Sequence, residues 1–338
     1  MQFEPIFFEK NRVGRVYSGG MLFRRFFNDD SVDGFFPEEW IASSVKALNR
    51  DTAYENEGVS KIKDSEMYLN EMLDQYPVEM LGSSKEMRIL VKILDSAVRL
   101  PAQAHPDKAY SKKYFHSEYG KTESWIILDT RPNAKIYFGF KDGVDKEIFS
   151  AAIDASETDK GAMERLMNWS EPKAGDVFLV PARTVHAIGA GCLILEVQEP
   201  TDFTIQPEHW CDDYKLSDQE MYMTLSKKDA LKCFDFGKVP DTKLTPKIVR
   251  ETDGVKVERI VTPEDTDCFI INRITVNGGS YVLNVVNSYG VYIATDGIGK
   301  LMGDNYSKEI KKGDYFFMPA CLMDKYLLTG NVEVIECY

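Results

Sequence analysis

The sequence lacks the features of exported, membrane-spanning and nucleic-acid-binding proteins. Its 338 residues hold no stretch of about 18 consecutive apolar residues, and the N-terminal segment has no apolar signal-peptide core. Runs of lysine and arginine are missing, and 41 basic against 54 acidic residues give a formal net charge of −13. Such a charge is repelled by nucleic-acid phosphates and anionic membranes. We therefore expect a cytoplasmic protein that binds neither nucleic acid nor membranes.

The cysteine pattern argues against disulfides and against zinc held by thiolates. The six cysteines lie far apart and form no Cys-x-x-Cys pair. With 43% hydrophobic residues, a chain of this length buries enough apolar surface to fold without disulfide bonds. At roughly 150 residues per domain, the length predicts about two domains.

Short segments rich in Val, Ile, Phe and Tyr dominate the chain, and Gly, Pro, Asn and Asp separate them. The predicted strands are 124–128, 135–140, 176–180, 192–197, 269–276, 281–286, 315–318 and 332–336. Helical spacing is limited to 68–76 before Pro77, to 162–167, and to a short helix opened by Ser226 with Asp229 three residues later. The pattern predicts a mainly β fold of sandwich or barrel type with a few inserted helices.

An internal repeat organises these strands. The segment 173–182, which reads Lys-x-Gly-Asp followed by an apolar run and Pro-Ala, recurs at 311–320. The repeat indicates two related β-domains, although an ordinary hairpin shows the same turn chemistry. Asp324 takes the place that His186 has after the first copy, and no histidine follows His209. We therefore expect any bound metal in the first domain only.

The segment 236–247 is the best candidate for a linker, because Gly237, Pro240 and Pro246 lie there among polar residues. This places a first domain over residues 1–236 and a second, metal-free domain over 237–338.

Histidine is scarce, and two of the four histidines stand in apolar, strand-like segments where an unpaired imidazole is costly to bury. Strand alternation places Gln103 and His105 on one face. The next strand carries Glu123 on one face, and His186 follows later. These four residues form an oxygen and nitrogen set that suits a catalytic Zn²⁺ with an open position, while Mn²⁺ or Fe²⁺ also tolerate it. The alternative is that both histidines are satisfied core residues on unrelated strands.

Three motifs give these residues a family context. They are Gln103-x-His105-Pro, Lys121-x-Glu123-x-Trp125 and Thr184-x-His186-Ala-x-Gly189. In this order they resemble the type I mannose-6-phosphate isomerases. Weaker pieces of the same resemblance are Gly19-Gly20-Met21-Leu22 and Glu39-Trp40. The resemblance covers residues 10 to 210 and continues weakly beyond. It implies two cupin-like jelly-roll β-domains, with inserted helices on the first.

The resemblance also implies roles for single residues. Gln103, His105, Glu123 and His186 match the family's metal ligands. Lys92, Asp107, Lys121 and Glu196 match positions that line its active site. For Lys92 an ordinary snorkelling lysine is the alternative. A carboxylate within Leu-Ile-Leu-Glu196-Val, by contrast, is rarely buried without a charged partner or a task.

One departure from the family concerns Gln206, which stands where the family has an arginine near the substrate. Glutamine keeps a neutral donor but loses the charge and the bidentate fork that bind an anion. Lys92, Lys121 and Arg183 could compensate for the lost charge. From the resemblance we expect Lys92, Lys121, Glu196 and Gln206 to take part in catalysis, and Asp107 and Arg183 to bind the substrate. Because of this departure, either the substrate of the protein or its catalytic rate is expected to differ from that of the family.

The implied activity is the metal-dependent interconversion of mannose 6-phosphate and fructose 6-phosphate through a cis-enediol. That reaction needs an electrophile for the carbonyl oxygen and a base between two carbons. The metal would be the electrophile, and either Glu196 or Lys121 the base. Alternatives are a sugar-binding cupin with weakened catalysis, an isomerase of another sugar or sugar phosphate, and a cupin oxidoreductase or epimerase. We expect a small-molecule sugar phosphate as substrate and no obligate protein partner.

Overall fold

Two large antiparallel sheets form the framework of the protein, whose computed structural model describes residues 3–49, 52–237 and 242–338. The first sheet has the order β1 (Arg12–Val13), β2 (Glu38–Ile41), β3 (Leu90–Ser96), β9 (Cys192–Gln198), β4 (Glu123–Thr130), β7 (Val177–Val180) and β12 (Lys243–Leu244). A smaller sheet packs beside it, formed by β6 (Met167–Ser170), β5 (Ile136–Phe140) and β8 (His186–Ile188). A short ribbon of β10 (Trp210–Cys211) and β11 (Tyr214–Lys215) completes this part.

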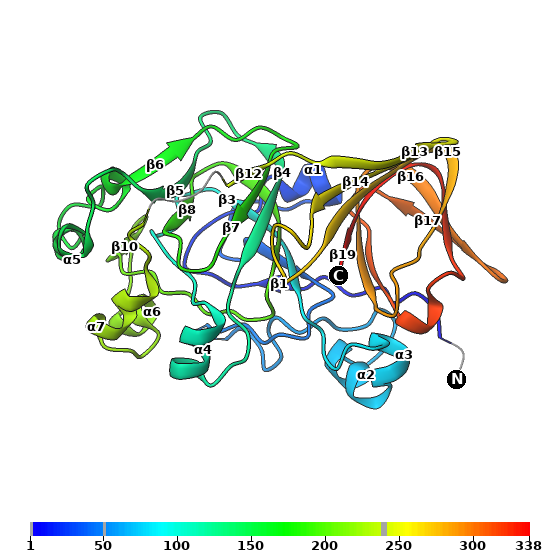
Figure 1. Ribbon diagram of the computed structural model, residues 1–338, viewed down its shortest axis with the longest axis horizontal. Coiled ribbons are helices and arrows are strands. Elements are labelled where there is room, and N and C mark those ends of the chain that lie inside the picture. The colour runs from blue at the N-terminus through cyan, green and yellow to red at the C-terminus, as the bar shows by residue number, and fades with distance from the viewer. Residues whose placement is uncertain (1–2, 50–51, 238–241) are drawn as a thin grey trace.

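The second large sheet gathers at the other end of the molecule (Figure 1). Its order is β13 (Lys247–Thr252), β14 (Val255–Val261), β15 (Ile271–Val282), β19 (Leu327–Cys337), β16 (Gly290–Gly303) and β17 (Tyr306–Lys311), and β18 (Tyr315–Met318) also pairs with β16. The predicted mainly β fold class is confirmed.

The helices are short, and α4 to α7 lie at the end away from the second sheet, whereas α2 and α3 lie near it (Figure 1). They are α1 (Phe23–Phe27), α2 (Leu69–Gln75), α3 (Pro77–Leu81), α4 (Lys108–Phe115), α5 (Lys146–Ala155), α6 (Asp218–Tyr222) and α7 (Lys227–Ala230). Single 3₁₀ turns occur at η1 (Glu164–Leu166), η2 (Leu231–Cys233) and η3 (Ala320–Leu322). Among the described residues, no helix combines the length and the apolar character that crossing a membrane requires.

Two sequence-based element predictions are wrong. Residues 162–167 form only the turn η1, because Met167 already begins β6 and pairs with Phe140. Residues 271–276 and 281–282 of the predicted strands 269–276 and 281–286 belong to one strand, β15, which ends at Val282, and residues 283–286 are not in a strand. A register shift between Asn277 and Ser280 keeps the strand continuous across two glycines, so these glycines mark a bulge and not a turn.

The helix boundaries that rest on capping chemistry are confirmed. Pro77 ends α2, and it also begins α3 as its first residue, where its missing N–H costs nothing. The Ser226 side chain accepts a hydrogen bond from the Asp229 backbone N–H and so caps α7.

The internal repeat has the same structure in both copies. Gly175 and Gly313 share a left-handed φ of 91°. Each following aspartate accepts a hydrogen bond from the backbone N–H of the lysine three residues earlier, at 3.1 Å for Asp176 and 2.9 Å for Asp314. The strand order β2-β3-β9-β4-β7 in the first sheet corresponds to β14-β15-β19-β16-β18 in the second. The predicted relation between the two halves is therefore visible in their topology.

The two sheets share one hydrophobic core. Ile93 and Leu195 of the first sheet belong to the same buried cluster as Val291 and Phe317 of the second. The N-terminal segment also crosses over, since Ile6 bridges to Phe317. The proposed domain boundary at residue 236 stays a prediction.

The described residues 242–247 of the predicted linker 236–247 contact both sheets. Residues 238–241, which include Pro240, are outside the described residues, while β12 pairs with β7 and β13 starts the second sheet.

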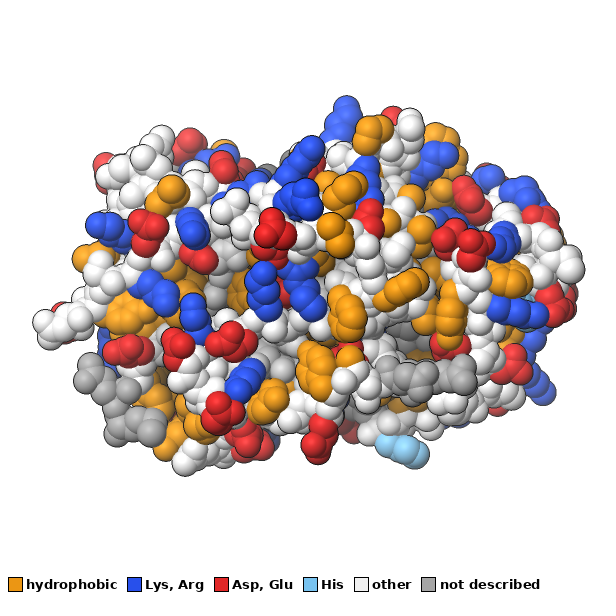
Figure 2. All heavy atoms as spheres, turned by 180° about the vertical axis from the view of Figure 1, so that it is seen from behind, with side chains coloured by type: hydrophobic (Ala, Val, Ile, Leu, Met, Phe, Trp, Pro, Cys, Tyr) orange, Lys and Arg blue, Asp and Glu red, His pale blue; other side chains and the backbone are white. Residues whose placement is uncertain are grey.

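On the face shown in Figure 2, acidic and basic side chains are interspersed, and neither sign covers that face continuously.

Candidate metal centre and active site

Three of the four predicted metal ligands converge inside the first half. His105 follows a bridging segment, Glu123 begins β4, and His186 begins β8. Their ligand atoms all lie within 4.8 Å of one another. The distance from Glu123 Oε2 to His105 Nε2 is 3.1 Å, and from Glu123 Oε1 to His186 Nε2 it is 3.4 Å. All three side chains are buried.

Hydrogen bonds orient the two imidazoles toward this centre. The Nδ1 atom of His105 lies 2.9 Å from the carbonyl oxygen of Phe203, and that of His186 lies 2.9 Å from the carbonyl oxygen of Thr184. Carbonyl oxygens only accept, so each Nδ1 carries the proton and each Nε2 points its lone pair inward. His186 Nε2 is buried without a hydrogen-bond partner among the described residues.

The protonation states also suit a cation. Burial and the charge of Lys121 lower the pKa of His105 to about 3, and burial lowers the pKa of His186. Both imidazoles are therefore neutral near pH 7, which is the form that binds a metal. Glu123 Oε1 accepts a 2.9 Å hydrogen bond from Trp125 Nε1, which holds the carboxylate in place. Two inward lone pairs and one oriented carboxylate fit a divalent ion.

Gln103, the fourth predicted ligand, is held next to His186 by backbone hydrogen bonds. Its N–H and C=O pair with the C=O and N–H of His186, both at 2.9 Å. Gln103 also lines the cavity described below, and its role as a ligand stays a prediction.

Lys121 and Glu196 lie beside the ligand set. Lys121 Nζ is 2.8 Å from His105 Nε2, 3.0 Å from Glu123 Oε2 and 3.8 Å from Glu196 Oε1. In β9, Glu196 is flanked by Lys92 of β3 and Trp125 of β4. Burial and the charge of Glu123 raise the pKa of Glu196 to about 8 against the opposing lysines. This carboxyl group can therefore hold or release a proton near neutral pH.

A second cluster of charges, which the sequence analysis did not identify, lies next to Lys92. Arg15 donates from Nε to Glu38 at 2.9 Å and from Nη2 to both Asp202 oxygens at 3.0 and 3.1 Å. Arg15 Nη1 donates to Asn49 at 2.7 Å. Glu38 lies directly before the Glu39-Trp40 motif, and Asp202 lies four residues before Gln206. This closeness in sequence to residues already singled out was the only signal that could have pointed to Glu38 and Asp202.

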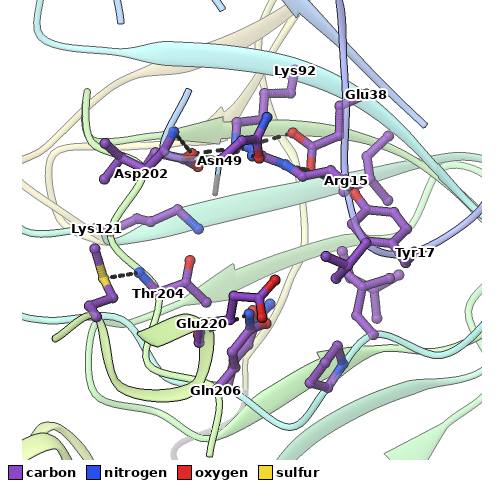
Figure 3. Close-up of a pocket in the computed structure, with 18 of the residues that line it drawn as sticks. Arg15, Tyr17, Glu38, Asn49, Lys92, Lys121, Asp202, Thr204, Gln206 and Glu220 are labelled. Carbon is purple, nitrogen blue, oxygen red and sulfur yellow. Dashed lines mark hydrogen bonds and ion pairs between the residues drawn. The ribbon is translucent and has the colours of Figure 1, made fainter. Parts of the chain in front are cut away.

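One cavity of about 460 Å³ joins the two groups. Its lining includes Arg15, Glu38, Asn49, Lys92, Gln103, Lys121, Glu123, Glu196, Asp202, Thr204 and Gln206. In Figure 3, Arg15, Glu38, Lys92 and Asp202 lie along one side, whereas Gln206 lies on another side with Lys121 between them. Gln206 Nε2 donates to the backbone oxygen of Glu220 at 3.3 Å, so it presents a neutral amide to the cavity.

The two predicted substrate-binding residues lie elsewhere. Asp107 caps α4 by accepting from the Tyr110 N–H at 2.7 Å, and its other oxygen lies 3.5 Å from Arg183 Nη1. Both side chains are more than a third exposed, and neither is part of the cavity lining. The structure pairs Asp107 and Arg183 with each other, and their contact with a substrate stays a prediction.

With this geometry established, known proteins show what the chain resembles. No protein-family model matches it. The mannose-6-phosphate isomerase of Streptococcus mutans is 28% identical over 99% of this chain and 98% of that protein. Mannose-6-phosphate isomerase ManA of Bacillus subtilis is 29% identical over 73% of each chain. Over nearly its whole length, the chain is therefore similar to mannose-6-phosphate isomerases.

A solved structure confirms the fold of the chain. The crystal structure of the Bacillus subtilis mannose 6-phosphate isomerase covers 99% of this chain with a TM-score of 0.80 at 23% identity. The predicted arrangement of two cupin-like β-domains agrees with this match. The predicted enzyme class, an isomerase, is confirmed by the named relatives, and a metal centre agrees with the His105, Glu123 and His186 cluster.

Proposed function

We propose that this isomerase interconverts mannose 6-phosphate and fructose 6-phosphate through a cis-enediol. The observation that carries the proposal is a triad able to bind a metal, His105, Glu123 and His186, whose member Glu123 lines the same cavity as Lys121 and Glu196. A structural metal site needs no proton-transfer groups beside it, whereas an aldose–ketose isomerase does.

We propose zinc as the resident ion, held by Gln103, His105, Glu123 and His186, although Mn²⁺ or Fe²⁺ also suit this donor set. A bound divalent ion supplies a Lewis acid for the carbonyl oxygen of the open-chain sugar. The glutamine oxygen is the unusual member of a zinc site, and the two histidines and the carboxylate are its ordinary members.

Either Glu196 or Lys121 moves the proton between C1 and C2. Their polar atoms lie 3.8 Å apart, and each is buried at the wall of the cavity. The raised pKa of Glu196 supports this carboxyl group as an acid and base near neutral pH. Lys121 Nζ, 3.0 Å from Glu123 Oε2, also places hydrogen-bond donors close to the oxygen atoms on which negative charge develops.

A coupled assay on the metal-loaded protein tests this proposal. We expect about one zinc ion per chain by elemental analysis, conversion of mannose 6-phosphate, loss of activity on chelation, and recovery with Zn²⁺. We expect Gln206→Arg to raise kcat/KM for mannose 6-phosphate by about tenfold, since a charge-assisted contact contributes about 1.5 kcal/mol.

Two outcomes contradict the proposal. The first is a metal-loaded protein that does not turn over mannose 6-phosphate. The second is faster turnover of free mannose than of the phosphorylated sugar, which removes the phosphate from the substrate. We place the reaction in the cytoplasm, and fractionation of the source cells tests that location.

A further inference from the structure

The side of the cavity formed by Arg15 and Lys92 carries more hydrogen-bond donors than its own carboxylates use. Glu38 already accepts from Arg15 Nε at 2.9 Å, from Tyr17 Oη at 2.6 Å and from Trp40 Nε1 at 2.7 Å. Asp202 accepts from Arg15 and from the backbone N–H of Leu48 at 2.8 Å. Both carboxylates are therefore largely saturated.

Lys92 is the first group left with unused donors. Its Nζ is 3.7 Å from Glu38 Oε2 and 3.7 Å from Asp202 Oδ1, which is too far for a hydrogen bond. It lies 4.7 Å from the centre of the Trp40 ring. Within the described residues, no hydrogen bond to this ammonium is present, although the side chain is only 3% exposed.

Arg15 is the second such group. A guanidinium has five N–H donors, and Nη1 carries two of them. One reaches Asn49 at 2.7 Å, and the other has no partner in the part of the chain that the structure describes. Because Glu38, Asn49 and Asp202 hold the guanidinium on three sides, little further ordering is needed when it binds a ligand.

The position of this pair relative to the metal triad matches the length of a sugar phosphate. Lys92 on β3 lies two strands away from Glu123 on β4, with β9 between them, which corresponds to roughly 10 Å at ordinary strand spacing. The seven bonds from C1 to the phosphorus of an extended hexose 6-phosphate span roughly 8 Å at backbone-like bond lengths. A substrate with its carbonyl at the triad therefore reaches Arg15 and Lys92 with its other end.

We propose that Arg15, together with Lys92, binds the phosphate of the sugar-phosphate substrate. This inference rests on the proposed function, because it assigns one end of that substrate to this side of the cavity. The guanidinium and the ammonium present their unused donors to the phosphate oxygens. Arg15 is then a specificity-determining residue that distinguishes phosphorylated from free sugars.

Calorimetric titration of the zinc-loaded protein with mannitol 6-phosphate and with mannitol tests this assignment. Neither compound has a carbonyl group, so binding is measured without turnover. In Arg15→Gln we expect the Kd for mannitol 6-phosphate to rise about ten- to a hundred-fold, while the Kd for mannitol stays within about twofold. Arg15→Lys keeps the positive charge but loses the bidentate geometry of the guanidinium. Its Kd for mannitol 6-phosphate should therefore lie between those of the wild type and Arg15→Gln.

Arg12→Gln is the matched control. Arg12 lies on the same N-terminal segment, is similarly buried and pairs with Glu39 and Asp29, but it does not line the cavity. We expect both Kd values to stay within about twofold in this variant. Equal weakening of both ligands in Arg15→Gln overturns the proposal, and so does no change in either.

If Arg15→Gln does not fold, Arg15→Lys decides by the same comparison of the two ligands. A wild type that binds mannitol 6-phosphate but does not isomerise mannose 6-phosphate refutes the proposed function alone. An active wild type whose Arg15 variants bind both ligands normally refutes this inference alone.

Discussion

Glu196 and Glu336 occupy equivalent positions in the two sheets, yet their surroundings differ in charge. Glu196 lies opposite Trp125 and Lys92 in the ladder, and Glu336 lies opposite Tyr292 and Asn272. Two lysines face the first carboxylate, whereas the second accepts 2.7 Å hydrogen bonds from Asn272 Nδ2 and Tyr292 Oη. The repeat thus keeps a buried carboxyl group in both halves and changes only how it is stabilised.

The metal triad shows the same divergence. Glu123 pairs with Val180 in the first sheet, and its counterpart opposite Met318 is Gly290. Asp324, at the place of His186, is exposed and has a left-handed φ of 64°. The second half is filled instead by large side chains such as Phe316 and Tyr326. A shared fold therefore holds a reaction cavity in one half and a packed core in the other.

The largest effect that distinguishes the halves concerns the metal. We expect His105→Ala and His186→Ala to lose most of the bound ion and to lower kcat/KM about a thousand-fold, since a metal stabilises transition-state charge by several kcal/mol. Elemental analysis and the isomerase assay measure both. Asp324→Ala is the control at the equivalent position and should change neither. Full metal content in both histidine variants would remove these residues from the ligand set.

The paired carboxylates should differ nearly as much in activity. Glu196→Gln removes a proton-transfer group from the cavity, and we expect kcat to fall about 10²- to 10⁴-fold with metal content unchanged. Glu336→Gln should leave kcat within about twofold, because its partners are Asn272 and Tyr292 in the packed half. Similar losses in both variants would show that the second half takes part in catalysis.

The two repeat turns should differ in stability. Gly175→Ala forces a left-handed residue into an open turn, and we expect a loss of about 1–2 kcal/mol in urea unfolding. At Gly313 an added Cβ would also lie 2.7 Å from the backbone oxygen of Phe26. We expect Gly313→Ala to cost at least about 1 kcal/mol more. Equal losses would mean that Phe26 moves aside freely.

The smallest effect is a pH dependence of stability. Burial raises the pKa of Glu336 above its ordinary value of 4.5, against hydrogen bonds from Asn272 and Tyr292. The folded state then binds this proton more tightly than the unfolded state, so ionisation above pH 4.5 destabilises the wild type. Relative to Glu336→Gln, the wild type should lose stability as pH rises from 4.5 through the raised pKa. A difference that stays constant over this range would contradict the shift.

Sequence reasoning succeeded where chemistry is local. The pair Ser226 and Asp229 predicted the N-terminal cap of α7, which the structure contains. The motifs around His105 and Glu123 predicted a metal site, and these two residues lie together with His186 in a cluster that can hold a metal. It failed where a local pattern has two outcomes. The glycines near Asn277 look like a turn but form a bulge, because the partner strand β19 continues past them.

By itself, the sequence determined the strand alternation, the repeated Lys-x-Gly-Asp turns and the types of residue around the metal, since each depends on neighbours a few positions apart. Only the tertiary structure decided which distant charges meet. Arg15 and Asp202 are 187 positions apart, and they share one cavity wall because β1 and β2 continue the sheet beyond β3. Asp107 and Arg183 became partners of each other in the same way. Strand order is set by burial summed over the whole core, and no single segment carries that information.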